Sequence, residues 1–212
     1  MNINLLKLVC FIVTDGGIYQ RRNQIYFDTT DDKLMNKFIE TARGLQVKHI
    51  YVSKGHGTKT IYFYSKELYQ HLKSLIGNEK TLPLDEMLRL SKKNIQEMLQ
   101  ILFSTDGGVS LSTSNCRTDG KKRIHRKVTF TSSNRRNLEI VKKLLQRFGV
   151  RGRIQNNGDL EIKGRRNLEK FKNLIGFIEG VKVTNKSKKW CGIEKNKLLD
   201  LCLKSYRYTH RE

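Results

Sequence analysis

The 212-residue sequence is short of several residue types, and each shortage excludes a class of protein. It holds one proline, Pro83, which excludes collagen-like and proline-rich chains. Its four cysteines form no Cys-x-x-Cys pair, so neither a zinc site nor a disulfide framework is predicted. No apolar run reaches the length of a membrane span, and no secretory signal is evident. We therefore expect a globular chain in a reducing compartment.

Acidic residues are also scarce, because 20 Asp and Glu stand against 42 Lys and Arg, a formal net charge of +22. The basic residues recur along the whole chain, so the charge belongs to the surface and not to one tail. A field of this size attracts polyanions, of which nucleic acid is the commonest. We expect a nucleic-acid partner and no membrane; a ribosome-associated or generally basic protein is the simpler alternative.

One short stretch occurs twice. Residues 8–17 and 99–108 are apolar runs that each end in Thr-Asp-Gly-Gly, which places Asp15 and Asp106 at matched positions. Such a run, closed by two glycines, favours a buried helix that ends at its carboxylate. Two such helices side by side bring the carboxylates together, where they repel unless a proton or a divalent cation lies between them. This predicts a metal site between duplicated halves; a simple Asp-Gly turn that ends each helix is the alternative.

The elements predicted around the two stretches follow one order. We predict an α+β fold, a pseudo-symmetric duplication of an α-β-β-α-β-β-α unit with two antiparallel sheets around a central pair of motif helices. Strands are expected at 18–22, 24–29, 47–52 and 59–64, and in a second set of hairpins at 108–131 (with a long loop at 115–127) and 150–163. The predicted divisions are a first half at 1–77, a linker at 78–90, a second half at 91–176 and a C-terminal helical extension at 177–212.

The motifs, with segments 65–69, 137–141 and 149–150, resemble those of LAGLIDADG homing endonucleases that carry both motifs in one chain, most closely the archaeal intron-encoded members. The acidic position and the glycine after it are intact in both copies. The small residues usual earlier in the motif are replaced by Val9, Cys10, Gln100 and Ile101. The resemblance implies a monomer whose sheets form a saddle on the major groove of double-stranded DNA, in an archaeal cytoplasm or an organelle and not secreted.

The resemblance also implies the metal site. Asp15 and Asp106, with the backbone carbonyls of Thr14 and Thr105, would ligate Mg²⁺, and Mn²⁺ or Ca²⁺ could occupy the same site. Metal-assisted attack on two phosphodiester bonds would cut both strands and leave short 3′ overhangs.

Two further roles follow from the resemblance. Lys66 and Arg165, or with a one-residue shift Arg166, stand where the family often carries a catalytic cation near the scissile phosphate. A solvent-exposed cation at a helix start is the alternative. After the second strand of each half, only Asn134 offers the amide with which relatives contact the attacking water.

Outward residues of the predicted strands are candidates for contact with bases, and the basic loop for contact with phosphates. A solvated face explains any one of them equally well, but not their shared bias toward Arg, Lys and Gln. The predicted DNA-binding residues are Tyr19, Arg21, Arg22, Gln24, Tyr26, Asp28, Ser110, Ser112, Lys121, Lys122, Arg123, Arg126, Lys127, Thr129, Thr131, Arg151, Arg153 and Gln155.

The predicted function is a site-specific double-strand DNA endonuclease of intron homing. The alternatives are an RNA-splicing maturase that binds its own intron RNA, and a DNA-binding regulator that does not cut. Intact aspartates in both motifs favour the nuclease. The extension at 177–212 either packs on the second half, through residues such as Trp190 and Leu201, or adds cations to the DNA contact.

Overall fold

A computed structural model describes residues 2–55, 57–115, 122–184 and 187–207, and it confirms the predicted α+β duplication. The first half contains α1 (Ile3–Val13), β1 (Gly16–Tyr19), a 3₁₀ turn (Gln20–Arg22), β2 (Gln24–Thr29), α2 (Asp32–Arg43), β3 (Tyr51–Gly55), β4 (Thr58–Tyr64) and α3 (Lys66–Ile76). After α4 (Leu84–Leu88), the second half contains α5 (Lys92–Thr105), β5 (Gly107–Asn115), β6 (Lys122–Thr131), α6 (Arg135–Gln146), β7 (Arg153–Ile154), β8 (Asp159–Lys163) and α7 (Arg165–Leu174). The chain continues into α8 (Lys195–Lys204) and a 3₁₀ turn (Ser205–Arg207).

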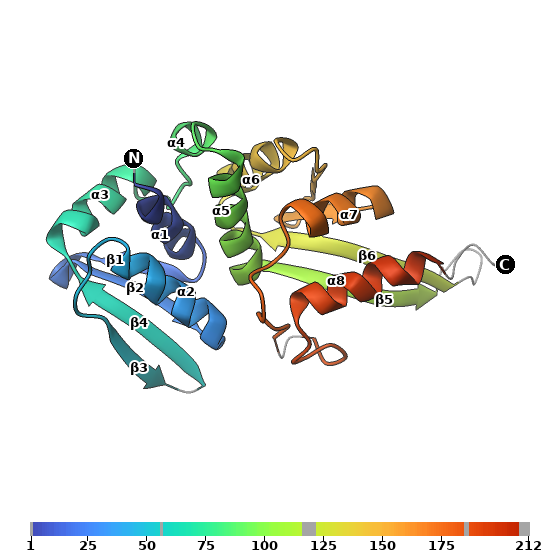
Figure 1. Ribbon diagram of the computed structural model, residues 1–212, viewed down its shortest axis with the longest axis horizontal. Helices are drawn as coiled ribbons and strands as arrows, with labels where there is room; N and C mark the ends of the chain where they lie inside the picture. Colours follow the sequence, from blue (N-terminus) through green and yellow to red (C-terminus); the bar gives the residue numbers. More distant parts are fainter. Residues whose placement is uncertain (1, 56, 116–121, 185–186, 208–212) are drawn as a thin grey trace.

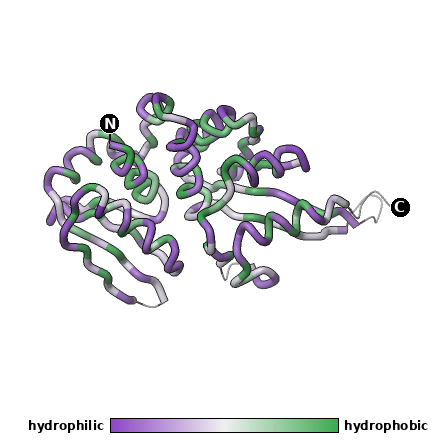
Figure 2. The backbone as a smooth tube through the Cα atoms, in the orientation of Figure 1, coloured by the Kyte–Doolittle hydropathy of each residue, from purple (hydrophilic) through white to green (hydrophobic). Residues whose placement is uncertain are grey.

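Each half has one antiparallel sheet, in the order β1-β2-β4-β3 and β5-β6-β8-β7. The two sheets lie on either side of the central helices α1 and α5 (Figure 1). Polar and hydrophobic residues alternate along the strands (Figure 2), so each sheet has one face on the core and one outer face. In β2, for example, Ile25 and Phe27 are buried, while Gln24 and Tyr26 belong to the outer face.

Equivalent phenylalanines build the two cores. Phe11 of α1 meets Phe27 of β2 with ring centroids 4.8 Å apart, and Phe103 of α5 meets Phe130 of β6 at 5.6 Å. All four rings are essentially buried, and burial of each stabilises the fold by about 1.5–3 kcal/mol. The duplication therefore extends from topology to packing.

The large residues of the motif helices do not prevent α1 and α5 from packing together. Val9, Cys10 and Ile101 are fully or almost fully buried. Gln100 instead binds the end of α7, since its Nε2 donates to the carbonyl of Ile175 at 2.7 Å. An ion pair between Lys7 and Glu97 further links the two helices.

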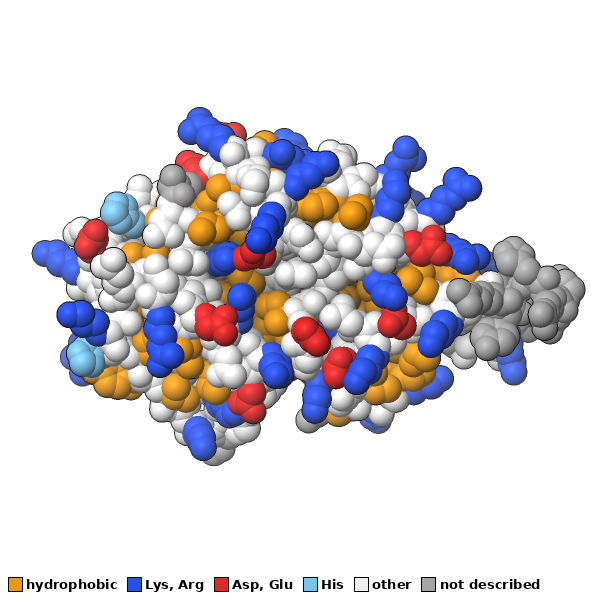
Figure 3. Space-filling model, in the orientation of Figure 1, with side chains coloured by type: hydrophobic (Ala, Val, Ile, Leu, Met, Phe, Trp, Pro, Cys, Tyr) orange, Lys and Arg blue, Asp and Glu red, His pale blue; other side chains and the backbone are white. Residues whose placement is uncertain are grey.

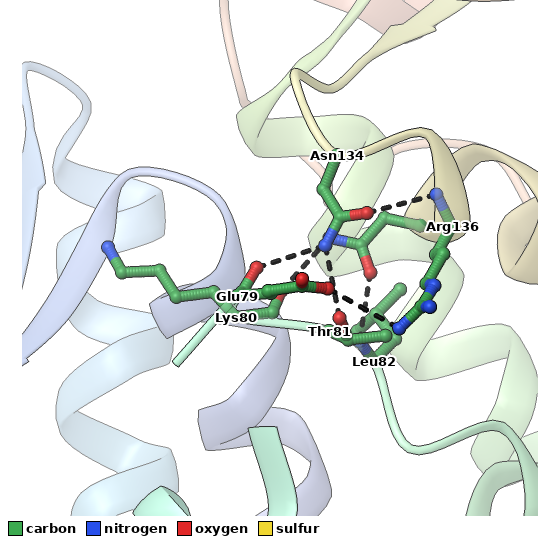
Figure 4. A network of polar contacts seen from close by, with 7 residues as sticks. Glu79, Lys80, Thr81, Leu82, Asn134 and Arg136 are labelled. Carbon is green, nitrogen blue, oxygen red and sulfur yellow. Dashed lines mark hydrogen bonds and ion pairs between the residues drawn. The ribbon is translucent and has the colours of Figure 1, made fainter. Parts of the chain in front are cut away.

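The linker at 78–90 is more ordered than a simple connection, because it contains α4 and is bound by the N-terminal end of α6 (Figure 4). The amide of Asn137, 1% exposed, accepts from the Leu82 N–H at 2.8 Å and donates to the Lys80 carbonyl at 3.0 Å. Asn134 donates to the Glu79 carbonyl at 2.9 Å. The second half thus fixes the linker backbone around Lys80.

Four predictions about strands are wrong. Residues 47–50 and 150–152 are not strands. In the predicted loop at 115–127, every described residue belongs to a strand, because β5 and β6 pair as far as Asn115 and Lys122. Residues 116–121 of that prediction lie outside the described residues. The first hairpin turns through a 3₁₀ helix, and Asn23 after it has a left-handed φ of 50°.

The C-terminal extension packs on the second half and also contacts the first half. In Figure 1, α8 runs beside β5. Trp190 Nε1 donates to the Leu111 carbonyl at 2.8 Å, and the Lys182 N–H donates to Asp31, at the start of α2, at 3.1 Å. Leu201, predicted as a packing residue, is 39% exposed. In the part of the chain that the structure describes, no helix is both long enough and apolar enough to cross a membrane.

Candidate active site and nucleic-acid interface

Both motif helices end in the same way. The Thr14 hydroxyl donates back to the Cys10 carbonyl at 3.0 Å, and the Thr105 hydroxyl donates to the Ile101 carbonyl at 3.0 Å. Each threonine side chain therefore turns into its own helix. This leaves only the backbone carbonyl of either threonine for the predicted role in metal binding.

Each motif aspartate is held by the second strand of its own sheet. The Asp15 carbonyl accepts from the Asp28 N–H at 3.1 Å, and the Asp106 carbonyl accepts from the Thr131 N–H at 3.1 Å. Asp15 is exposed and Asp106 is partly exposed. The two carboxylates thus stand at equivalent, rigidly held turns at the ends of paired helices.

The first glycine of each motif lets the helix end approach the second strand closely. A Cβ on Gly16 would lie 2.6 Å from the Tyr26 carbonyl oxygen of β2. One on Gly107 would lie 2.9 Å from the Thr129 carbonyl oxygen of β6 and 2.4 Å from the Phe103 carbonyl oxygen of α5. All these obstacles are backbone atoms, which cannot rotate away. Gly108 differs, because a Cβ there would meet only the Thr129 hydroxyl at 3.6 Å.

We expect Gly107→Ala to distort the Asp106 turn, to cost about 1–3 kcal/mol of stability, and to reduce cleavage of DNA. Gly108→Ala, one residue further on, is the matched control and should leave thermal unfolding and cleavage close to those of the unaltered protein. Thermal denaturation and a cleavage assay on both variants check this. Equal behaviour of the two variants would show that close approach at Gly107 is not required.

The oxygen atoms at the ends of the two motif helices suit a hard divalent cation that takes only part of its ligands from the protein. Among the described residues, no three His, Cys, Asp or Glu side chains gather in a group that could hold a metal ion. Two carboxylates and two backbone carbonyls are oxygen donors of the kind that Mg²⁺ and Ca²⁺ accept, with water and phosphate completing the shell.

A buried lysine from the C-terminal extension reaches the second motif. The Lys195 side chain, 5% exposed, donates to the Ser104 and Gly107 carbonyls, both at 2.7 Å. Burial lowers the pKa of Lys195 to about 8, and the carboxylates of Asp31, Asp106 and Asp15 partly offset this effect. One ammonium group therefore lies within electrostatic range of both motif aspartates.

A lysine from the linker reaches the first motif in the same way. Lys80 Nζ donates to the Gly16 carbonyl at 3.0 Å, and Gly16 is the equivalent of Gly107. Neither Lys80 nor Lys195 belongs to the repeated unit, so comparison of the two halves could not find them.

The residues predicted as catalytic cations are all exposed. Lys66 is exposed at the start of α3. Arg165 is exposed on α7 and pairs with Glu169 at 2.9 Å, and Arg166 beside it is also exposed. Asn134, the candidate for contact with the attacking water, instead caps α6 through its side-chain oxygen and binds the linker through its side-chain nitrogen.

The outer face of the second sheet is polar and basic. Strand register places most of the predicted second-half residues on it. Glu161 lies among them and accepts from Lys127 and Lys163, both at 2.5 Å. Burial alone would raise the pKa of Glu161, but these two hydrogen bonds outweigh it and the pKa is lowered. The predicted residues on this face are Ser110, Ser112, Arg123, Lys127, Thr129, Thr131 and Arg153.

Other predicted contacts lie outside that set. Strand alternation places Lys122 and Arg126 on the opposite face of β6. Arg126 donates to the Ser205 hydroxyl at 2.6 Å and lies 4.1 Å from the centroid of the Tyr206 ring. It thus anchors the 3₁₀ turn that follows α8. Arg151 and Gln155 flank β7, and Lys121 lies outside the described residues.

In the first half, the predicted residues Tyr19, Gln24, Tyr26 and Asp28 share the outer face of the first sheet. Arg21 and Arg22 belong to the exposed 3₁₀ turn and not to a strand. Lysine and arginine side chains also spread over both halves of the molecule on the face that Figure 3 shows. This distribution agrees with a charged surface rather than a charged tail.

Comparison with known proteins gives three findings. Residues 93–176 match a family model described as a LAGLIDADG-like domain. No curated protein sequence matches the chain. Several solved structures of homing endonucleases are similar to it, although sequence identity to them is low.

The similar structures include mesophilic variants of the homing endonuclease I-DmoI, with 20% identity over 82% of this chain and 91% of that chain and a TM-score of 0.58. I-DmoI in complex with DNA and Ca²⁺ gives 20% identity, the same coverage and a TM-score of 0.56. The homing endonuclease I-WcaI bound to its DNA recognition sequence gives 16% identity over 84% of both chains and a TM-score of 0.57. Other I-DmoI complexes with DNA were solved with Mn²⁺ or in the presence of Mg²⁺. This chain therefore has the fold of the LAGLIDADG homing endonucleases, and its second half carries a LAGLIDADG-like domain.

Proposed function

We propose that this protein is a site-specific endonuclease that cuts both strands of a DNA duplex, using a divalent cation at Asp15 and Asp106. The observation that carries the proposal is the matched pair of aspartate turns, each at the end of a central helix and each held by the same backbone hydrogen bond. The DNA complexes of I-DmoI and I-WcaI, which share the fold, support it.

The chemistry is hydrolysis of one phosphodiester bond in each strand. A water oxygen forms a new bond to phosphorus while the bond from phosphorus to the 3′ oxygen breaks, and that oxygen takes up a proton. The bound cation would stabilise charge on the attacking and leaving oxygens. Asp15, Asp106 and the carbonyls of Thr14 and Thr105 would hold it, and Mg²⁺ is the physiological choice we favour.

Lys80 and Lys195 have a supporting role in this proposal. Each ammonium binds the carbonyl of the glycine that follows a motif aspartate, so it fixes the turn and adds positive charge beside the carboxylate. Positive charge placed in advance near a phosphate stabilises the extra negative charge of the transition state. The outer faces of the two sheets would follow the major groove on either side of the cleavage site, with one monomer bound per duplex.

The test begins by selecting duplexes that the full-length protein binds from a random library, in Ca²⁺. Selected duplexes are then incubated with the protein and Mg²⁺ or Mn²⁺, with EDTA as the control. We expect cutting of both strands at one position, short 3′ overhangs, and no cutting in EDTA. Binding of structured RNA without any cutting of selected duplexes would contradict the proposal and favour the maturase. Specific duplex binding without cutting would favour the regulator. Intron homing itself requires cleavage of the intronless insertion site.

A further inference from the structure

The outer face of the first sheet is rich in tyrosine. Five of the chain's eight tyrosines belong to it: Tyr19, Tyr26, Tyr51, Tyr62 and Tyr64. Strand register places three of them abreast, because Tyr26 of β2 pairs with Tyr62 of β4, and Tyr62 pairs with Tyr51 of β3. We call these five residues the tyrosine face.

Three rings of the tyrosine face pack on one another, and three of its five side chains are exposed. Tyr51 stacks on Tyr62 with centroids 5.4 Å apart, and Tyr64 meets Tyr62 edge-on at 5.7 Å. Tyr19, Tyr51 and Tyr64 remain 53%, 47% and 42% exposed. An exposed aromatic surface of this kind marks a binding site more often than a solvated sheet.

Charge is almost absent from this face. At the outward positions of β1 to β4, no lysine or arginine occurs among the described residues, and the one charged side chain is Asp28, which accepts from the Thr60 hydroxyl. The outer face of the second sheet, in contrast, presents Lys127, Lys163 and Arg153. The two sheets have the same topology, but the outer face of the first is aromatic and the outer face of the second is charged.

Given the endonuclease function proposed above, we propose that the two sheets read their half-sites by different chemistry. The tyrosine face binds a thymine-rich half-site of the duplex, through contact of its rings with the C5 methyl groups and hydrogen bonds from its hydroxyls. The second sheet binds the other half-site mainly through charged groups. In the major groove only thymine offers a methyl group, and apolar contact is the way proteins read it.

Ring packing favours a duplex over unpaired bases. A base stacks on an aromatic side chain only if one face of the ring is open, and the Tyr51–Tyr62 and Tyr62–Tyr64 contacts occupy faces and edges within the cluster. The stacked contact covers one face of the Tyr51 ring and one of the Tyr62 ring, so fewer ring faces are free to stack on an unpaired base.

The test measures binding, not cleavage, so its result is independent of whether the protein cuts DNA. Duplexes are selected from a random library in Ca²⁺, and thymine is then replaced by uracil, which lacks only the methyl group, in one half-site at a time. We expect thymine to be enriched in one half-site, and uracil there to weaken binding by on the order of tenfold for two or three methyl groups. Uracil in the other half-site should change little.

Variants test whether the tyrosine face causes the effect of uracil on binding. Tyr64→Ser should lose most of the response to uracil, and Tyr64→Phe should keep it, while neither changes the salt dependence of binding. Lys127→Gln should keep the uracil response and lower the salt slope by about 1. The proposal is overturned if thymine is not enriched in one half-site, if uracil acts equally in both, or if single strands bind more tightly than duplexes. The uracil experiment uses the unaltered protein, so a poorly folded variant cannot hide the answer.

Discussion

Exchanging either motif aspartate for asparagine should reduce cleavage by at least about a hundredfold, without loss of DNA binding. Loss even of a group that only supports a metal ligand costs about 10–100-fold, so loss of a ligand charge should cost more. The fold should survive, because a backbone hydrogen bond to the second strand of the sheet holds each turn and does not depend on the exchanged carboxylate. Each exchange also removes a negative charge, and this change by itself strengthens binding of DNA, which is a polyanion.

Asp15→Asn and Asp106→Asn are best compared with Asp85→Asn, which makes the same charge change at an exposed position of α4. Cleavage is followed for each strand separately on selected duplexes in Mg²⁺, and binding is measured in Ca²⁺. Asp85→Asn should cut both strands at the normal rate. If either motif variant still cut both strands, the assignment of these two aspartates as the metal-binding catalytic residues would be wrong.

Much of the fold was predictable because local signals agreed with one another. The apolar runs that end in Gly-Gly define α1 and α5, and alternation in 24–29 correctly separates the buried Ile25 and Phe27 from the outward Tyr26. The equivalent positions of Asp15 and Asp106 at the ends of α1 and α5 followed from the repeat alone. Where local signals were weak, as at 47–50 or in the polar stretch 115–127, strand boundaries were missed.

The supporting lysines were not predictable, because their positions depend on tertiary contacts. Lys80 reaches Gly16 only because Asn137, distant in sequence, binds the linker backbone. Lys195 reaches Gly107 because the extension folds back over the second half. Arg126 was misplaced for a related reason: its partner Ser205 belongs to a segment with no counterpart in the repeat.

We expect each motif aspartate to serve mainly one strand of the duplex. Lys195→Met should then slow cutting of the strand served by Asp106 about 10–100-fold. At pH 7 the group is mostly protonated, since its pKa is about 8, so the change removes a cation. It also leaves the carbonyls of Ser104 and Gly107 without their shared donor, and the turn that holds Asp106 should loosen. Stability should change less than activity, because removal of a buried charge offsets part of the lost hydrogen bonding.

Lys197→Met on the same helix is the control, because that side chain is exposed and pairs with Glu194 at 2.9 Å, away from the motif turn. Lys80→Met tests the counterpart and should slow the strand served by Asp15. Strand-resolved cleavage gives the answer, with thermal unfolding measured beside it. If the lysine had a purely structural role, its replacement would slow cleavage of both strands equally, in proportion to the fraction of protein that is unfolded. If Lys195→Met behaves in that way, the ammonium stabilises the extension and does not organise the turn that holds Asp106.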